Sequence, residues 1–103
     1  MRVGFDLDGT SWKYREFFST IAIGLKLVNV EIGIVTIHKG LKNPDLKLWL
    51  SRGFPPADFY FSKDEYPVDL DVRSWKIMVC KENDIHYLFD DFESDEIKLM
   101  GIE

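Results

Sequence analysis

The chain has 103 residues, of which 46% are hydrophobic and 15% aromatic, and this composition excludes an intrinsically disordered protein. A chain of this length is expected to fold as one domain, residues 1–103, with a core of its own. The net charge of −5 argues against a general nucleic-acid binder, because affinity for the phosphate backbone requires clustered Lys and Arg. No signal peptide or long apolar stretch is evident, so we expect a cytoplasmic protein that does not bind membranes.

Apolar, β-rich runs alternate with helical patterns along the chain. The patterns predict, in order, a strand at 2–7, a helix at 14–28, a strand at 31–37, a helix at 44–52, a strand at 57–62, a helix at 74–83, a strand at 85–90 and a helix at 94–100. This alternation favours an α/β fold of the three-layer, Rossmann-like kind, with a mostly parallel sheet and helices on both faces.

Capping residues support the boundaries of these helices. Asn43 precedes Pro44 and predicts the start of the second helix, which Gly53 then closes. Ser74 and Ser94 are the predicted N-caps of the third and fourth helices. The chain stops at Gly101-Ile102-Glu103, and only four strands are predicted. Without a fifth strand, one edge of the sheet is expected to be exposed or paired with a partner.

Two aspartates separated by one residue end the first predicted strand, in the run Asp6-Leu7-Asp8-Gly9-Thr10. Residues i and i+2 of a strand point the same way, so two carboxylates are aimed at one spot. Such crowding is tolerable when a cation lies between the carboxylates or when one of them stays protonated. Gly9 lets the backbone turn and approach a ligand, although these residues alone also fit an ordinary acidic loop.

Further polar residues mark the ends of other predicted strands. Thr36 closes the second strand, the pair Asp90 and Asp91 closes the last, and Lys76 opens the helix before it. In parallel sheets the ligand crevice lies beyond the carboxyl ends of the strands, at the point where strand order reverses. The carboxylates and the hydroxyl are therefore expected to meet there.

In order and spacing these motifs resemble those of the haloacid dehalogenase superfamily of phosphohydrolases, over nearly the whole chain. The family motifs are Asp-x-Asp-Gly-Thr, a strand-terminal Thr or Ser, a Lys, and a strand-terminal acidic pair. The resemblance implies a phosphomonoester hydrolase that forms an aspartyl-phosphate. The segments 9–13 and 63–73 are too short for a cap domain, which implies an open, capless member acting on nucleotides, nucleic-acid ends or phosphoproteins, or covered by another subunit of a homo-oligomer.

The chemistry of phosphoryl transfer assigns a role to each residue. Asp6 is the expected nucleophile and Asp8 the expected general acid and base. Thr36 is expected to hydrogen-bond the phosphoryl group, and Lys76 to balance charge, with Lys63 as the rival lysine. The expected cofactor is Mg²⁺, and its ligands are drawn from Asp6, the backbone carbonyl of Asp8, Asp90 and, through water, Asp91. The expected contacts to substrate, besides Thr36 and Lys76, come from Gly9, Thr10 and His38.

The remaining large residues are assigned to packing. Cys80 is expected in the core, and the aromatic residues on the helix faces that pack on the sheet are Phe17, Phe18, Trp49 and Trp75. Trp12 and Tyr14 are expected to pack in the core rather than to stack on a base. Two other readings of the site stay open: a receiver-like domain that only accepts a phosphoryl group, and a catalytically silent phosphate-binding module.

Overall fold

A computed structural model of the chain describes residues 1–37, 42–91 and 98–102. The elements are β1 (Arg2–Phe5), the short π-type turn η1 (Leu7–Ser11), α1 (Arg15–Leu27), β2 (Glu31–Thr36), α2 (Lys42–Ser51), β3 (Phe59–Ser62), α3 (Val72–Glu82), β4 (Tyr87–Asp90) and β5 (Lys98–Gly101). Within the described residues, no helix is long and apolar enough to cross a membrane.

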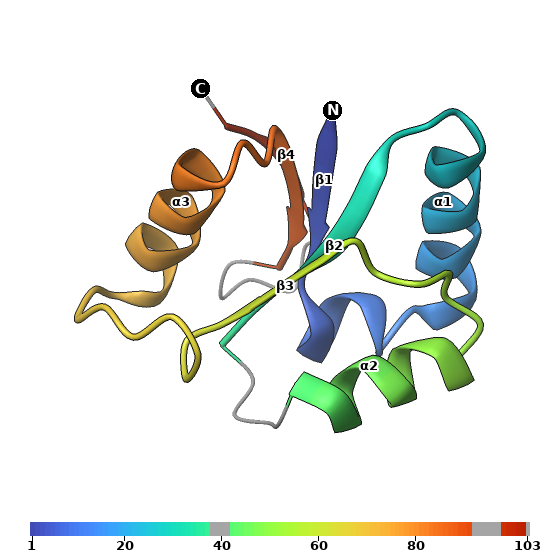
Figure 1. Cartoon of the computed structure of the whole chain (residues 1–103), viewed down its shortest axis with the longest axis horizontal. Coiled ribbons are helices and arrows are strands. Elements are labelled where there is room, and N and C mark those ends of the chain that lie inside the picture. Colours follow the sequence, from blue (N-terminus) through green and yellow to red (C-terminus); the bar gives the residue numbers. More distant parts are fainter. Residues whose placement is uncertain (38–41, 92–97, 103) are drawn as a thin grey trace.

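The strands form one five-stranded sheet in the order β3-β2-β1-β4-β5. The first four strands are mutually parallel, and β5 pairs antiparallel with β4. The chain first moves outward from β1 through β2 to β3, and then crosses to the other side of β1 to form β4 (Figure 1). Strand order therefore reverses between β1 and β4, and a crevice is expected beyond their carboxyl ends, the lower ends in Figure 1.

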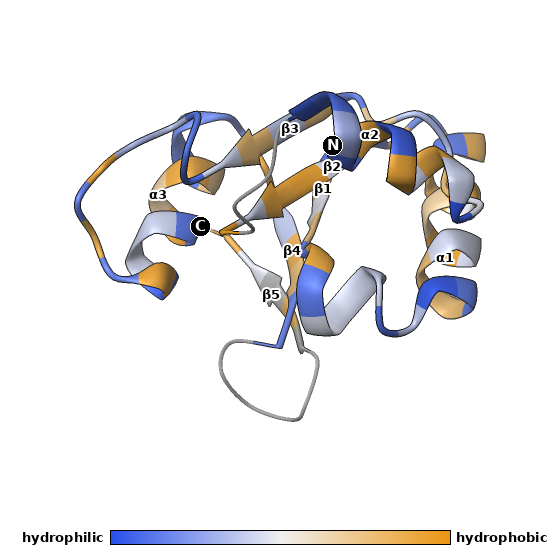
Figure 2. Ribbon diagram, turned by 90° about the horizontal axis from the view of Figure 1, so that it is seen from below, coloured by the Kyte–Doolittle hydropathy of each residue, from blue (hydrophilic) through white to orange (hydrophobic). Residues whose placement is uncertain are grey.

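Helices cover both faces of the sheet. Figure 2 shows α3 on one side of the strands and α1 with α2 on the other, with the hydrophobic strand β2 between them. Phe5 and Ile34 point into the core beneath α1 and α2, whereas the next residue along, Val35, joins Leu88 in the core beneath α3. This alternation follows from the two-residue period of a strand and confirms the predicted α/β architecture.

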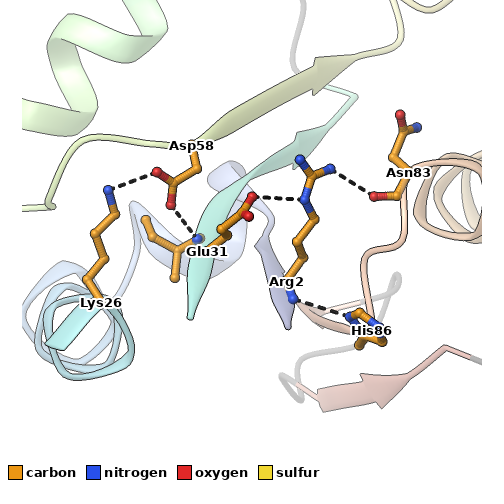
Figure 3. Close-up of polar contacts among 7 residues, drawn as sticks. Arg2, Lys26, Glu31, Asp58, Asn83 and His86 are labelled. Atoms are coloured by element: carbon orange, nitrogen blue, oxygen red, sulfur yellow. Dashed lines mark hydrogen bonds and ion pairs between the residues drawn. The ribbon is translucent and has the colours of Figure 1, made fainter. Parts of the chain in front are cut away.

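Ion pairs and hydrogen bonds fasten the amino ends of the strands (Figure 3). The Nε of Arg2 donates to Glu31 at 3.0 Å, and its guanidinium also donates to the carbonyl of Asn83. Lys26 pairs with Asp58 at 3.1 Å, and the same Asp58 carboxylate accepts a hydrogen bond from the amide at the start of β2. These contacts join β1, β2, α1 and the segment before β3 on the side of the sheet away from the motifs.

The predicted terminal helix at 94–100 is wrong over its last residues, because residues 98–101 form β5. The rest of that prediction, with its cap Ser94, lies outside the described residues. The expected lack of a fifth strand is likewise wrong, since β5 pairs with β4. Lys98-Leu99-Met100-Gly101 can adopt either conformation by itself, and the neighbouring unpaired edge of β4 decides for the strand.

Two helix starts differ from expectation. The N-cap of α3 is Asp71 rather than Ser74: the Asp71 carboxylate accepts hydrogen bonds from the Ser74 amide and hydroxyl, both at 2.9 Å, so Ser74 completes the cap from inside the helix. Helix α2 begins at Lys42, so Pro44 lies within its first turn. Gly53, with φ of +90°, follows the end of α2 as predicted.

Most of the packing assignments are confirmed, but those of Phe17 and Tyr14 are wrong. Cys80 and the aromatic residues Phe18, Trp49 and Trp75 are buried. Phe17 is 55% exposed, because α1 turns this residue away from the sheet. Tyr14 is also exposed, whereas Trp12 is half-buried and packs against the core beneath α1.

Candidate functional site

The first motif forms a sharp turn directly after β1. The amide of Asp6 donates to the carbonyl of Phe89 at 3.0 Å, which holds the buried Asp6 against β4. Asp8 (φ −67°, ψ 132°) and Gly9 (φ 76°, ψ −12°) then take the angles of a type II turn. The turn leaves Asp8 exposed above Asp6, so one carboxylate is fixed by the sheet and the other lies at the surface.

Gly9 is required at its position for two reasons. Its positive φ is a conformation that other residues rarely adopt. A Cβ at this position would also lie 2.4 Å from an Oδ of Asp91. The glycine therefore lets the turn after β1 approach the end of β4 closely enough to bring the acidic residues of the two strands together.

Lys76 extends from α3 into the middle of these carboxylates. Its Nζ donates to Asp6 at 3.2 Å and to Asp90, and the whole lysine is only 3% exposed. The rival Lys63 instead donates to the backbone carbonyl of Leu70 at 2.7 Å, away from the acidic residues. The structure therefore places Lys76, not Lys63, in the site.

Three carboxylates meet around the lysine. Asp6, Asp90 and Asp91 each offer an oxygen, and these oxygens all lie within 4.8 Å of one another. Oxygen donors at this spacing suit a hard divalent cation such as Mg²⁺, which keeps several waters among its ligands. The residues present therefore fit the expected metal, with Asp8 close by in sequence to add its backbone carbonyl.

The crowding changes the pKa values of the site. Burial, reinforced by the charges of Asp90 and Asp91 and only partly offset by Lys76, raises the pKa of Asp6 to about 7. Burial likewise raises the pKa of Asp91, aided by its contact with Asp90. For Lys76 burial acts in the opposite direction, but the charges of Asp6 and Asp90 outweigh it and raise the pKa. The site thus holds a firmly protonated lysine and more carboxylate than it can neutralise.

The predicted residues surround one pocket of about 350 Å³. Its lining residues are Asp6, Asp8, Thr36, Ile37, Val72, Arg73, Lys76, Asp90 and Asp91. Every residue expected in catalysis or metal binding is therefore at this pocket. Thr36 lies buried at the end of β2.

Two residues expected to contact substrate do not line the pocket. Thr10 is buried and its hydroxyl donates to Asp6 at 3.4 Å, so it orients the Asp6 carboxylate. Gly9 shapes the turn, as its contact with Asp91 shows. His38 lies outside the described residues.

The sequence interpretation missed three lining residues, Ile37, Val72 and Arg73. Arg73 is the most informative of them, because it adds a second cation to an acidic pocket. It precedes Lys76 by three residues, and residues at this spacing share one face of a helix. Once Lys76 was assigned to the site, helical periodicity was the signal that could have added Arg73.

In comparisons with protein-family models, curated proteins and solved structures, no significant match to this chain was found.

Proposed function

We propose that the chain is a Mg²⁺-dependent phosphomonoester hydrolase that acts through an aspartyl-phosphate on Asp6, in a capless domain of the haloacid dehalogenase type. The observation that carries this proposal is the convergence of Asp6, Asp90 and Asp91 around the buried Lys76. Crowded carboxylates of this kind destabilise a fold, so their presence at the crevice of the sheet favours a functional role.

In the first half of the proposed reaction, a carboxylate oxygen of Asp6 attacks the phosphorus of the substrate. The bond between phosphorus and the leaving oxygen breaks, and Asp8 donates its proton to that oxygen. The exposed position of Asp8 at the mouth of the turn suits contact with a departing alcohol. Asp6 is suited to attack because β1 and its hydrogen bond to Phe89 fix its backbone.

In the second half, water attacks the phosphorus of the aspartyl-phosphate while Asp8, now ionised, accepts the proton of that water. Inorganic phosphate leaves and the Asp6 carboxylate is restored. Thr36 and Lys76 bind the non-bridging oxygens and stabilise their charge in both steps. When bound to Asp6, Asp90 and the Asp8 carbonyl, Mg²⁺ would reduce the repulsion between an anionic nucleophile and an anionic phosphate.

The pocket has features that bear on the leaving group. Arg73 and Ile37 lie along its lining, and the segment from Lys63 to Asp71 between β3 and α3 is too short to form a cap domain. A pocket lined by both a guanidinium and an apolar side chain suits a leaving group with both a charge and a flat or apolar part. Nucleotides, nucleic-acid ends and phosphopeptides are therefore the substrates to test first.

A receiver-like domain remains the alternative, and the order of residues disfavours it. In receiver domains the acidic pair follows the first strand and the phosphoryl-accepting Asp follows a strand in mid-chain. Here the mid-chain strand β3 ends at the buried Ser62, whereas the Asp-x-Asp motif follows β1. Turnover needs a general acid and base such as Asp8, and a domain that only accepts a phosphoryl group lacks one.

Trapping with a phosphoryl analogue tests the proposal. With BeF₃⁻ and Mg²⁺, a crystal structure is expected to show the analogue on the Asp6 carboxylate in contact with Thr36 and Lys76. The variant Asp6→Asn should lose the adduct and the hydrolysis of p-nitrophenyl phosphate, whereas the matched control Asp58→Asn at the far end of the sheet should keep both. An adduct on Asp8 or Asp90, or an active Asp6→Asn, would show that the nucleophile is assigned wrongly. A stable adduct without turnover of any phosphate ester would favour the receiver alternative.

A further inference from the structure

Helix α1 is apolar on its outward face as well as on the face that packs against the sheet. Phe18 and Ala22 are buried against the core, as expected of a helix that covers a sheet. On the opposite face, Phe17 is 55% exposed, Ile23 44% and Leu27 79%. In Figure 1 this helix forms an outer side of the molecule. A surface helix normally carries charged residues on its outward face, so α1 is unusual.

The polar content of this face is small. Between Glu16 and Lys26 the helix contains no charged residue. Thr20, on the outward face, donates its hydroxyl to the carbonyl of Glu16 at 2.8 Å, and Ser19 donates to the same carbonyl at 3.2 Å. Both hydroxyl groups thus donate hydrogen bonds within the helix itself. Burying them at an interface therefore costs less free energy.

Gly24 lies in the middle of the same face, and the monomer does not need it. A Cβ at this position would meet no atom within 4 Å, so packing inside the monomer leaves room for a side chain. A glycine inside a helix costs about 1 kcal/mol relative to alanine. A surface glycine of this kind is useful where another backbone approaches closely.

We propose that α1 is a dimerisation surface, on which the α1 of a second copy of this chain packs antiparallel. The residues Phe17, Thr20, Gly24 and Leu27 follow each other at intervals of three, four and three, which is the spacing of a helix-pairing seam. Their sizes run large, small, small, large, symmetrically about position 22. A two-fold axis at that position sets Phe17 of each copy against Leu27 of the other, and Thr20 against Gly24, as an isologous contact requires.

The two basic residues of α1, Arg15 and Lys26, lie away from the seam, and Lys26 pairs with Asp58 of its own chain. The antiparallel contact therefore buries neither of them. A membrane is a poorer fit to this face, because a protein of net charge −5 is repelled by anionic lipid surfaces.

The contact is expected to be modest in strength. A 13-residue helix is about 20 Å long, so a single helix pair covers less than the roughly 800 Å² per partner of a standard interface. Exposed Tyr14 and Leu99 line a groove of about 440 Å³ next to Phe17 and extend the apolar surface beyond the seam. None of the site residues lies on this surface, and dimerisation through α1 is independent of the proposed phosphatase activity.

Sedimentation velocity on the full chain over a concentration series tests the proposal. The wild type is expected to shift from monomer to dimer at a concentration between about 10 µM and 1 mM. Leu27→Glu should remove the dimer, whereas Leu50→Glu, which alters an equally apolar and 50% exposed residue on α2, should leave it unchanged. A wild type that stays monomeric throughout, or a dimer that survives Leu27→Glu, would overturn the proposal.

Gly24→Leu separates dimerisation from folding. Because a side chain at this position enters open space, the variant should keep or raise the melting temperature of the monomer while losing the dimer. A variant that dimerises like the wild type would show that the helices do not approach at this residue.

Disulfide trapping tests the antiparallel orientation. A mixture of Phe17→Cys and Leu27→Cys chains should cross-link on oxidation, whereas either variant alone should not, because like positions are about 15 Å apart along the pair. Cross-linking of a single variant would indicate a parallel pair and refute the proposed geometry. A monomer that instead co-sediments with phosphatidylcholine vesicles through Leu27 would identify a membrane surface.

Discussion

The two ends of the sheet handle charge in opposite ways. At the amino end, each cation has one anionic partner near solvent, with Arg2 on Glu31 at 3.0 Å and Lys26 on Asp58 at 3.1 Å (Figure 3). At the carboxyl end, the buried Lys76 faces both Asp6 and Asp90. Asp91 adds a further carboxylate to the same cluster.

The two ends of the sheet therefore contribute differently to the protein. Exposed pairs of one cation and one anion add little to stability, and they leave no charge that a ligand would have to neutralise. A buried cluster with excess carboxylate is held together by the surrounding fold, and it gains free energy when a cation or a proton arrives. The carboxyl end is therefore the end suited to bind a ligand, and substitutions at the two ends test this contrast.

The largest expected effect comes from removing the buried lysine. Lys76→Met leaves Asp6 and Asp90 without their cation and should reduce the free energy of unfolding by about 3–5 kcal/mol at neutral pH. The matched variant Arg2→Met at the amino end should cost about 1 kcal/mol or less. Urea denaturation in EDTA measures both values, and equal losses would contradict the contrast between the two ends.

The second effect is on catalysis alone. If Asp8 is the general acid, Asp8→Asn should slow the hydrolysis of an alkyl phosphate by about 10²–10⁴-fold. Because Asp8 is exposed, the free energy of unfolding should change by less than about 0.5 kcal/mol. Full activity on the alkyl ester would remove Asp8 from this role.

A third effect follows from the excess of carboxylate. Mg²⁺ at about 100 times its dissociation constant should stabilise the fold by about 2.7 kcal/mol, since it binds the native cluster and not the unfolded chain. Thermal unfolding should show the gain for the wild type and for Glu31→Gln, and not for Asp90→Asn. An unchanged melting temperature of the wild type in millimolar Mg²⁺ would argue against a metal site.

The smallest effect concerns the cap that fixes the start of α3 and hence the position of Lys76. Hydrogen bonds from the Ser74 amide and hydroxyl lower the pKa of Asp71. A lowered native pKa means that the stabilisation is present above the ordinary carboxyl pKa and is lost as pH falls through the native value. Asp71→Ala should therefore lower the melting temperature at pH 7, and the difference from wild type should vanish in acid. A difference in melting temperature that persists at low pH would show that Asp71 stabilises the start of α3 by packing rather than as a charged cap.

Much of the site could be predicted from the sequence. The positions of Asp6, Thr36 and Asp90 at strand ends follow from local patterns, and parallel strands necessarily bring their carboxyl ends to one edge. The apolar runs that predicted β1 and β2 correspond to strands in which almost every residue is buried. These features depend on short-range backbone geometry, which the sequence encodes directly.

Other features were decided by tertiary structure. The strand at Lys98–Gly101 exists because β4 offers an unpaired edge, and the exposure of Phe17 depends on how α1 rotates against the sheet. The choice of Lys76 over Lys63, and the presence of Arg73 in the pocket, depend on where α3 begins and how it lies on its face of the sheet. Each of these outcomes rests on contacts between segments distant in the chain, and local propensity differs too little between the alternatives to decide among them.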